Sequence, residues 1–68
     1  MKAISGKRIA RLLEQRGWSL QRITGSHHIY TKPGFEVRIT VPIHGNKTLK
    51  AGLQRHLMKL DGIVEGDL

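Results

Sequence analysis

Hydrophobic and polar residues near the N-terminus follow the period of an amphipathic helix. Ile9, Leu12 and Leu13 recur at the i, i+3, i+4 spacing of one helix face. Ser5 precedes them and has a side chain suited to capping a helix N-terminus. Gly17 follows them and can adopt the left-handed conformation that ends a helix. The pattern therefore predicts a first helix between Ser5 and Gly17.

The middle of the chain has the composition and the alternation of β-strands. Residues 18–24 are rich in strand formers, Gly25-Ser26 suits a turn, and residues 27–32 form a second predicted strand. Pro33-Gly34 then reverses the chain direction. Residues 35–41 alternate strictly between apolar and polar, which predicts a third strand with one buried face. The residues expected on that buried face are Phe35, Val37, Ile39 and Val41.

A leucine stripe predicts a second helix near the C-terminus. Leu49, Leu53, Leu57 and Leu60 recur on one helix face, and Gly62 can end it. Because each element offers one apolar side, the economical packing is a three-stranded antiparallel sheet with both helices on one face. We therefore predict an α+β fold in the order α-β-β-β-α. The 68 residues make a single domain, 1–68, with an acidic tail from about residue 61.

The pairing of the second and third strands decides which of two adjacent histidines faces the helices. A loop with an even number of residues places Tyr30 and His28 on the core side and leaves His27 on the open face near Arg38. It pairs Tyr30 with Val37, His28 with Ile39, and His27 with Thr40. An odd loop exchanges the two faces, because a one-residue slip inverts every side chain. We favour the even register, which buries Tyr30 with Phe35 and Val37.

The charge of the chain is strongly positive. Twelve Lys and Arg residues stand against five acids, and Asp61, Glu65 and Asp67 are three of those acids. Residues 1–60 therefore carry twelve basic and two acidic side chains, a formal charge of +10. Such a surface attracts polyanions, of which nucleic acid is the commonest, although an acidic protein or a membrane surface would also respond to it.

The same composition limits cofactors and location. There is no cysteine, and no stretch approaches the roughly 20 apolar residues needed to cross a bilayer. We expect a cytoplasmic protein with no membrane contact. Adjacent histidines in a strand point to opposite faces and cannot easily bind one ion, so we expect no metal and no cofactor.

Several segments together resemble the HicA family of bacterial toxin-antitoxin toxins. They are Glu14-Gln15-Arg16-Gly17-Trp18, Gly25-Ser26-His27-His28-Ile29-Tyr30, Val41-Pro42-Ile43-His44 and the Leu-rich last helix. The resemblance implies the fold of the double-stranded RNA-binding domain. It also implies a metal-independent endoribonuclease that cleaves mRNA and is blocked by a HicB-type antitoxin. The first histidine of the family motif, three positions before an aromatic residue, maps onto His27, with His28 as the second choice.

The chemistry of histidine agrees with the activity that the resemblance implies. Histidine is the side chain that most readily exchanges protons near neutral pH. In RNA cleavage an imidazole could deprotonate the 2'-hydroxyl or protonate the leaving 5'-oxygen. Lys32 and Arg38 could neutralise the charge that develops on the phosphorane. The reaction profits from both an acid and a base, and water or Tyr30 could supply the second function.

Two departures from the family pattern concern packing. The last helix begins with Ala51-Gly52 where many relatives have a Gly-Thr pair, and His56 stands at a usually aliphatic position.

The side chains expected to contact RNA are basic or lie beside the motif. They are Lys7, Arg8, Arg11, Lys32, Arg38, His44, Lys47 and Lys50. The alternative function is a non-catalytic RNA-binding module with the same fold and charge, which would not require His27.

Overall fold

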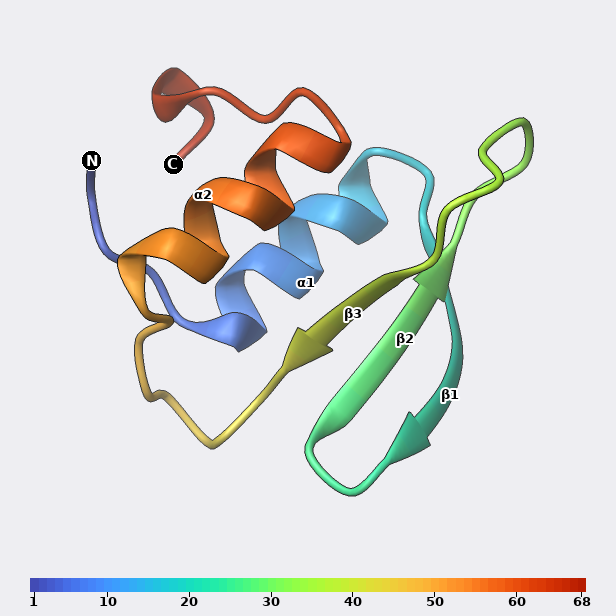
Figure 1. Cartoon of the computed structure of the whole chain (residues 1–68), viewed down its shortest axis with the longest axis horizontal. Helices are drawn as coiled ribbons and strands as arrows, with labels where there is room; N and C mark the ends of the chain where they lie inside the picture. Colours follow the sequence, from blue (N-terminus) through green and yellow to red (C-terminus); the bar gives the residue numbers. More distant parts are fainter.

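The elements of the fold follow the predicted order α-β-β-β-α. The computed structural model describes residues 1–68. Its elements are α1 (Gly6–Gln15), β1 (Ser19–Thr24), β2 (His27–Thr31), β3 (Ile39–Pro42), α2 (Ala51–Leu60) and a short 3-10 turn, η1 (Glu65–Asp67). The strands form one antiparallel sheet in the order β1-β2-β3. Both helices lie on the same side of this sheet (Figure 1), so the predicted α+β fold is confirmed.

Both ends of α1 are formed as the sequence predicts. Ser5 Oγ accepts a hydrogen bond from the Arg8 backbone N–H at 3.0 Å, which satisfies one of the free donors of the first turn. At the other end Gly17 has a φ of +95°, and the Trp18 N–H bonds back to the Leu13 carbonyl at 3.0 Å. This is a Schellman ending, and it turns the Trp18 side chain into the core.

The core lies between the two helices and the helix-facing side of the sheet. Ile9, Leu13, Ile39 and Val41 are fully buried, and Tyr30 is nearly so. The segments before and after α2 add Leu49 and Ile63 to the same cluster.

The leucine stripe of α2 is only partly buried. Leu57 is buried, but Leu53 is 36% exposed, and the fully buried side chain next to it is the polar Gln54. Gln54 Oε1 accepts a hydrogen bond from the Ile4 N–H at 3.0 Å, and its Nε2 donates to the Lys2 carbonyl at 2.6 Å. The helix is thus turned toward the N-terminal segment, a placement that apolar spacing alone does not reveal.

The predicted third strand starts too early. The strand begins at Ile39, and Phe35 and Val37 are 43% and 46% exposed instead of buried. The Phe35 N–H bonds to the Lys32 carbonyl at 3.1 Å, which closes a turn. The Phe35 ring then packs against Trp18 with centroids 5.3 Å apart, at the edge of the core.

The strand pairing differs from the predicted pairs by two residues. The observed Cα partners in β2 and β3 are Tyr30 with Ile39, His28 with Val41, and His27 with Pro42. A shift of two preserves the face of every side chain, since the period of a strand is two. The predicted faces are therefore right although the predicted partners are wrong: Tyr30 is 2% exposed on the core side, and His27 is exposed on the other.

A β-bulge in β1 changes which side chains reach each face. Leu20 pairs with Tyr30 and Arg22 pairs with the adjacent Ile29, so Gln21 is the extra residue. In a regular strand Leu20 and Arg22 would share a face. The bulge instead places Leu20 with Tyr30 on the helix-facing side and Arg22 with Ile29 on the open side.

Candidate functional site

His27 lies on the face of the sheet that no helix covers. It begins β2, the central strand, with Thr24 of β1 and Pro42 of β3 as its Cα partners on either side. Its side chain is exposed and takes part in no hydrogen bond or ion pair with the protein. Strand pairing on both sides fixes the backbone beneath it, and the exposed imidazole remains open to a long polymer.

Arg22 shares the open face with His27, and the sequence analysis did not select it. Because Thr24 pairs with His27 and Arg22 pairs with Ile29, Arg22 is a diagonal neighbour of His27. Diagonal neighbours across antiparallel strands are roughly 7–8 Å apart, within reach of long side chains. Arg22 is exposed and free of ion pairs.

Two cations that were expected to assist His27 lie elsewhere. Arg38 immediately precedes Ile39, the partner of Tyr30, whereas His27 pairs with Pro42 at the other end of β3. The expected proximity of His27 and Arg38 is therefore wrong, and the cause is the two-residue shift in pairing. Lys32 lies 3.7 Å from Asp61 Oδ1 and 4.9 Å from the centre of the Phe35 ring, so it serves a structural cluster.

His28 lines a cavity on the opposite, helix-facing side of the sheet. The cavity has a volume of about 300 Å³, and we refer to it as the His28 cavity. Its polar lining consists of Lys7, Arg11 and Glu14 from α1 and His28 and Tyr30 from β2. Its apolar lining consists of Ala10, Leu20 and Ile43. The fold thus separates the adjacent histidines and brings His28 together with two of the cations expected to contact RNA.

Tyr30 and Glu14 form a hydrogen-bonded pair in this cavity. Tyr30 Oη donates to Glu14 Oε2 at 3.3 Å. Burial, followed by the negative charge of Glu14 and this hydrogen bond, raises the pKa of Tyr30 to about 12. Tyr30 therefore stays protonated near neutral pH, and it faces away from His27, so it does not supply the second proton-transfer group for His27.

A second cavity lies next to the partner of His27. It has a volume of about 310 Å³, lies between the loop after β3 and the start of α2, and we refer to it as the Pro42 cavity. Three expected RNA-contacting residues, His44, Lys47 and Lys50, line it together with Pro42. Arg8, by contrast, is half-buried on α1 and lines neither cavity.

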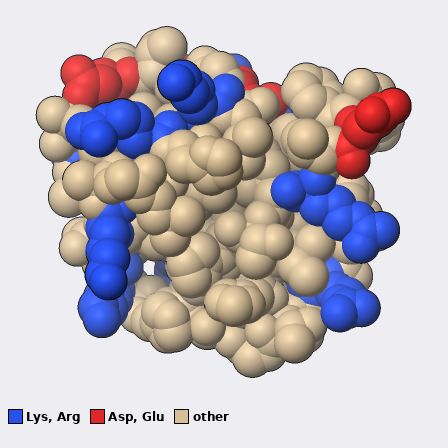
Figure 2. All heavy atoms as spheres, in the orientation of Figure 1, with Lys and Arg blue, Asp and Glu red and all other residues tan.

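On the face shown in Figure 2, the basic side chains do not form one continuous patch. Lys and Arg lie along the α2 side and along the β1 side of this face, with a wide uncharged area between them. Five of the residues expected to contact RNA line two different cavities: Lys7 and Arg11 line the His28 cavity, and His44, Lys47 and Lys50 line the Pro42 cavity.

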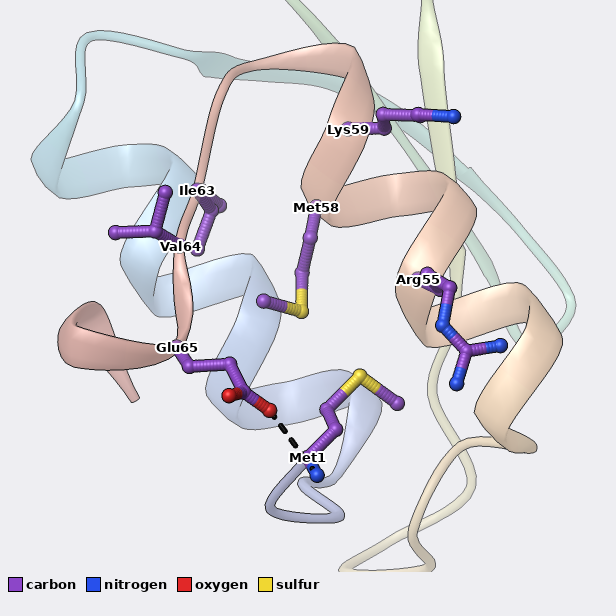
Figure 3. Close-up of a pocket in the computed structure, with 7 residues that line it drawn as sticks. All are labelled: Met1, Arg55, Met58, Lys59, Ile63, Val64 and Glu65. Atoms are coloured by element: carbon purple, nitrogen blue, oxygen red, sulfur yellow. Dashed lines mark ion pairs between the residues drawn. The ribbon is translucent and has the colours of Figure 1, made fainter.

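The largest cavity, of about 470 Å³, has no motif residue in it. It lies between α2 and the C-terminal segment, with Met58, Ile63 and Val64 as apolar lining (Figure 3). The Met1 amino group and Glu65 Oε1 form an ion pair of 3.0 Å at its edge. This cavity contains no histidine and none of the residues expected to contact RNA.

The structure contains no cluster of side chains that could bind a metal ion and no helix that could cross a membrane. No three His, Cys, Asp or Glu side chains converge where they could hold an ion. Neither α1 nor α2 has the length and apolar character that a membrane-spanning helix requires.

Comparison with known families identifies the chain. The family model of the HicA toxin of bacterial toxin-antitoxin systems matches residues 6–63. The chain belongs to the HicA toxin family. Membership of a toxin-antitoxin family implies an antitoxin partner for this HicA toxin. No curated protein matches the chain.

Proposed function

We propose that this HicA-family toxin is an endoribonuclease that cleaves mRNA, with His27 as the catalytic residue. The observation that carries the proposal is the exposed His27 on the uncovered face of the sheet, in a chain whose family is that of the HicA toxins. A polymer can lie across this face without entering a pocket. The positive charge of residues 1–60 supports attraction of the phosphate backbone.

The proposed reaction is transesterification within the RNA strand. His27 moves the proton of a 2'-hydroxyl, the 2'-oxygen attacks the adjacent phosphorus, and the bond from phosphorus to the 5'-oxygen breaks. The leaving 5'-oxygen takes up a proton, which leaves a 2',3'-cyclic phosphate and a 5'-hydroxyl end. Arg22, on the same face, stabilises the charge that develops on the phosphoryl oxygens.

The second proton-transfer group is best sought next to His27. Tyr30 is buried on the helix-facing side of the sheet, opposite to the face that carries His27. His44 is exposed and lines the Pro42 cavity beside the partner of His27. The Ile43 N–H bonds to the Ser26 carbonyl at 2.8 Å, so the loop that carries His44 is attached directly before His27. His44 is thus an imidazole near the end of the sheet that carries His27, and water is the other source of the proton.

We propose that a HicB-type antitoxin inhibits the toxin by covering the open face of the sheet. A partner bound there would exclude RNA from His27 without altering the toxin fold. This part of the proposal predicts that the antitoxin still binds a His27→Ala protein.

Replacing His27 tests the proposal directly. His27→Ala should lower the cleavage rate of a defined RNA by roughly two to four orders of magnitude, the usual effect of losing a general acid or base. RNA affinity and thermal stability should change little, because the side chain is exposed. Expression of the wild type should stop growth, whereas expression of the variant should not. His56→Ala, which removes an exposed imidazole from α2, is the matched control and should keep full activity.

Two results would contradict the assignment. A folded His27→Ala protein with full cleavage, together with an inactive His28→Ala protein, would transfer the catalytic function to His28. A wild type that binds RNA and never cleaves it would favour the non-catalytic RNA-binding module.

Cleavage should also persist in EDTA. Loss of cleavage in EDTA that is restored by one particular metal would refute a metal-independent mechanism.

A further inference from the structure

The His28 cavity has two unpaired basic side chains at its edge. Lys7 and Arg11 are four residues apart on α1, so their side chains lie on one face of the helix. Both are exposed, both line the cavity, and neither belongs to an ion pair of the protein. Two free cations at the edge of one cavity can bind a phosphate group through charge-assisted hydrogen bonds.

The sheet side of the cavity offers apolar surface. Leu20 is 41% exposed there because the β1 bulge directs it to the helix-facing side, and Ile43, from the loop after β3, also lines the cavity. The His28 imidazole adds a ring on which a base can stack. A volume of about 300 Å³ is at the lower end of the range for small-molecule sites, so the occupant is about the size of one nucleotide.

Glu14 sets the orientation of that occupant. Its Oε2 accepts the Tyr30 hydrogen bond, so the carboxylate is held inside the cavity. A carboxylate repels phosphate but accepts hydrogen bonds from base N–H groups. Because Glu14 lies one helical turn beyond Arg11, the phosphate belongs at the Lys7 end and the base at the Glu14 end.

We propose that the His28 cavity binds a single nucleotide of the RNA substrate. The phosphate contacts Lys7 and Arg11, and the base lies against Leu20 and His28. This inference rests on the proposed function and extends it, because His28 becomes a substrate-binding residue distinct from the catalytic His27. The bound nucleotide is not the one cleaved, since the two histidines project from opposite faces of the sheet.

Titration of the wild-type protein with small probes tests the site without any cleavage. The probes are adenosine 5'-monophosphate, adenosine and inorganic phosphate, followed by NMR of the imidazole and methyl signals. The nucleotide should shift the signals of His28 and Leu20 and leave those of His56 in place. It should also bind more tightly than adenosine or phosphate alone. Unmoved His28 and Leu20 signals, or phosphate binding as tight as nucleotide binding, would overturn the proposal.

Matched variants separate the cavity from general electrostatics. Lys7→Gln combined with Arg11→Gln should weaken nucleotide binding about tenfold or more, the usual effect of losing hydrogen bonds to a charged group. Arg55→Gln together with Lys59→Gln removes the same charge from α2, outside the cavity, and should have little effect. Leu20→Ser should weaken binding, whereas Val64→Ser should not, because Val64 is exposed in the C-terminal segment and does not line the His28 cavity. If the two charge variants, or the two serine variants, lose the same amount of nucleotide affinity, the proposed site is contradicted.

Cleavage kinetics distinguish failure of this inference from failure of the proposed function. His28→Ala should raise KM for a defined RNA and leave kcat nearly unchanged, whereas His27→Ala should lower kcat. Nucleotide binding in the cavity without any cleavage by the wild type would refute the ribonuclease and keep the site. Cleavage that depends on His27, without nucleotide binding in the cavity, would refute the site alone.

Discussion

Asp61 Oδ2 accepts a hydrogen bond from Arg16 Nε at 2.6 Å, which joins the end of α2 to the end of α1. Arg16 also donates to the Asp61 carbonyl at 2.9 Å, and Lys32 lies 3.7 Å from the other carboxylate oxygen. The buried Trp18 Nε1 makes no hydrogen bond of regular geometry, but it lies near this carboxylate. One acidic side chain therefore holds together both helix ends and the end of β2.

The Asp61 cluster predicts a loss of stability in acid. Burial alone would raise the pKa of Asp61, but the hydrogen bond from Arg16, the proximity of Trp18 and the charge of Lys32 outweigh it and lower that pKa below 3.8. The group therefore stabilises the fold above its ordinary pKa, and that contribution disappears as the pH falls through the lowered value.

Asp61→Asn should lower the free energy of unfolding by about 1–2 kcal/mol at neutral pH, a value reduced because Arg16 is partly solvent-screened. Urea unfolding from neutral to strongly acidic pH should show the difference from wild type shrinking below about pH 4. Glu36→Gln, at an exposed carboxylate without an ion pair, is the control. If the difference in the free energy of unfolding between wild type and Asp61→Asn stays constant with pH, the lowered pKa of Asp61 is contradicted.

Tyr30 predicts a loss of stability in alkali. Its pKa of about 12 in the folded protein exceeds the ordinary value of 10.0. Because the unfolded chain ionises first, the tyrosine contributes stability below pH 10 that is lost as the pH rises toward 12. The loss should be on the order of 2–3 kcal/mol at the upper end. Tyr30→Phe should remove this part of the pH dependence. The free energy of unfolding of both proteins should be measured by urea unfolding between about pH 8 and pH 12, and an equal dependence on pH in the two proteins would refute the prediction.

Gly6 lies where α1 meets β3. A Cβ at this position would collide with the backbone carbonyl oxygen of Pro42, the strand partner of His27. Gly6→Ala should therefore lower the melting temperature markedly, since backbone must move. Gly52→Ala, in the first turn of α2 where a Cβ meets open space, should be neutral or stabilising by up to about 1 kcal/mol. Equal changes in the melting temperature for the two substitutions would show that α1 and β3 are not in close backbone contact at Gly6.

The sequence predicted the elements whose signals are local. The Ser5 cap, the Gly17 ending and the alternation around Tyr30 each depend on a few neighbouring residues, and each is present in the structure. The placement of His27 on the open face and His28 on the helix-facing side was also predicted, because it needs only the parity of the strand pairing.

Features set by long-range contacts were not predictable in the same way. Phe35 has the apolar character of a buried strand residue, but the turn closed by Lys32 directs it onto Trp18 instead. Gln54 is buried because the Ile4 N–H and the Lys2 carbonyl need a partner, and both lie about fifty residues away in sequence. The bulge at Gln21, which sends Arg22 to the open face, has no signature in residue spacing.

The position of Arg22 leads to a prediction that separates it from Arg38. Both side chains are exposed arginines, but Arg22 is a diagonal neighbour of His27, whereas Arg38 lies at the far end of β3. Arg22→Gln should lower kcat for RNA cleavage by about tenfold, the effect of losing one charge-assisted hydrogen bond to the reacting phosphate. Arg38→Gln should leave kcat near the wild-type value.

Salt dependence shows whether Arg22 also binds phosphate in the ground state. RNA affinity of the wild type should fall steeply with added salt, because each neutralised phosphate releases counterions. If Arg22 contacts a phosphate before reaction, Arg22→Gln should reduce the slope of log affinity against log salt by about 0.7, the value for one contact on a single strand. An unchanged slope with a tenfold lower kcat would mean that Arg22 acts only as charge develops. A larger loss of kcat in Arg38→Gln than in Arg22→Gln would show that the reacting phosphate lies at the other end of the sheet, away from His27.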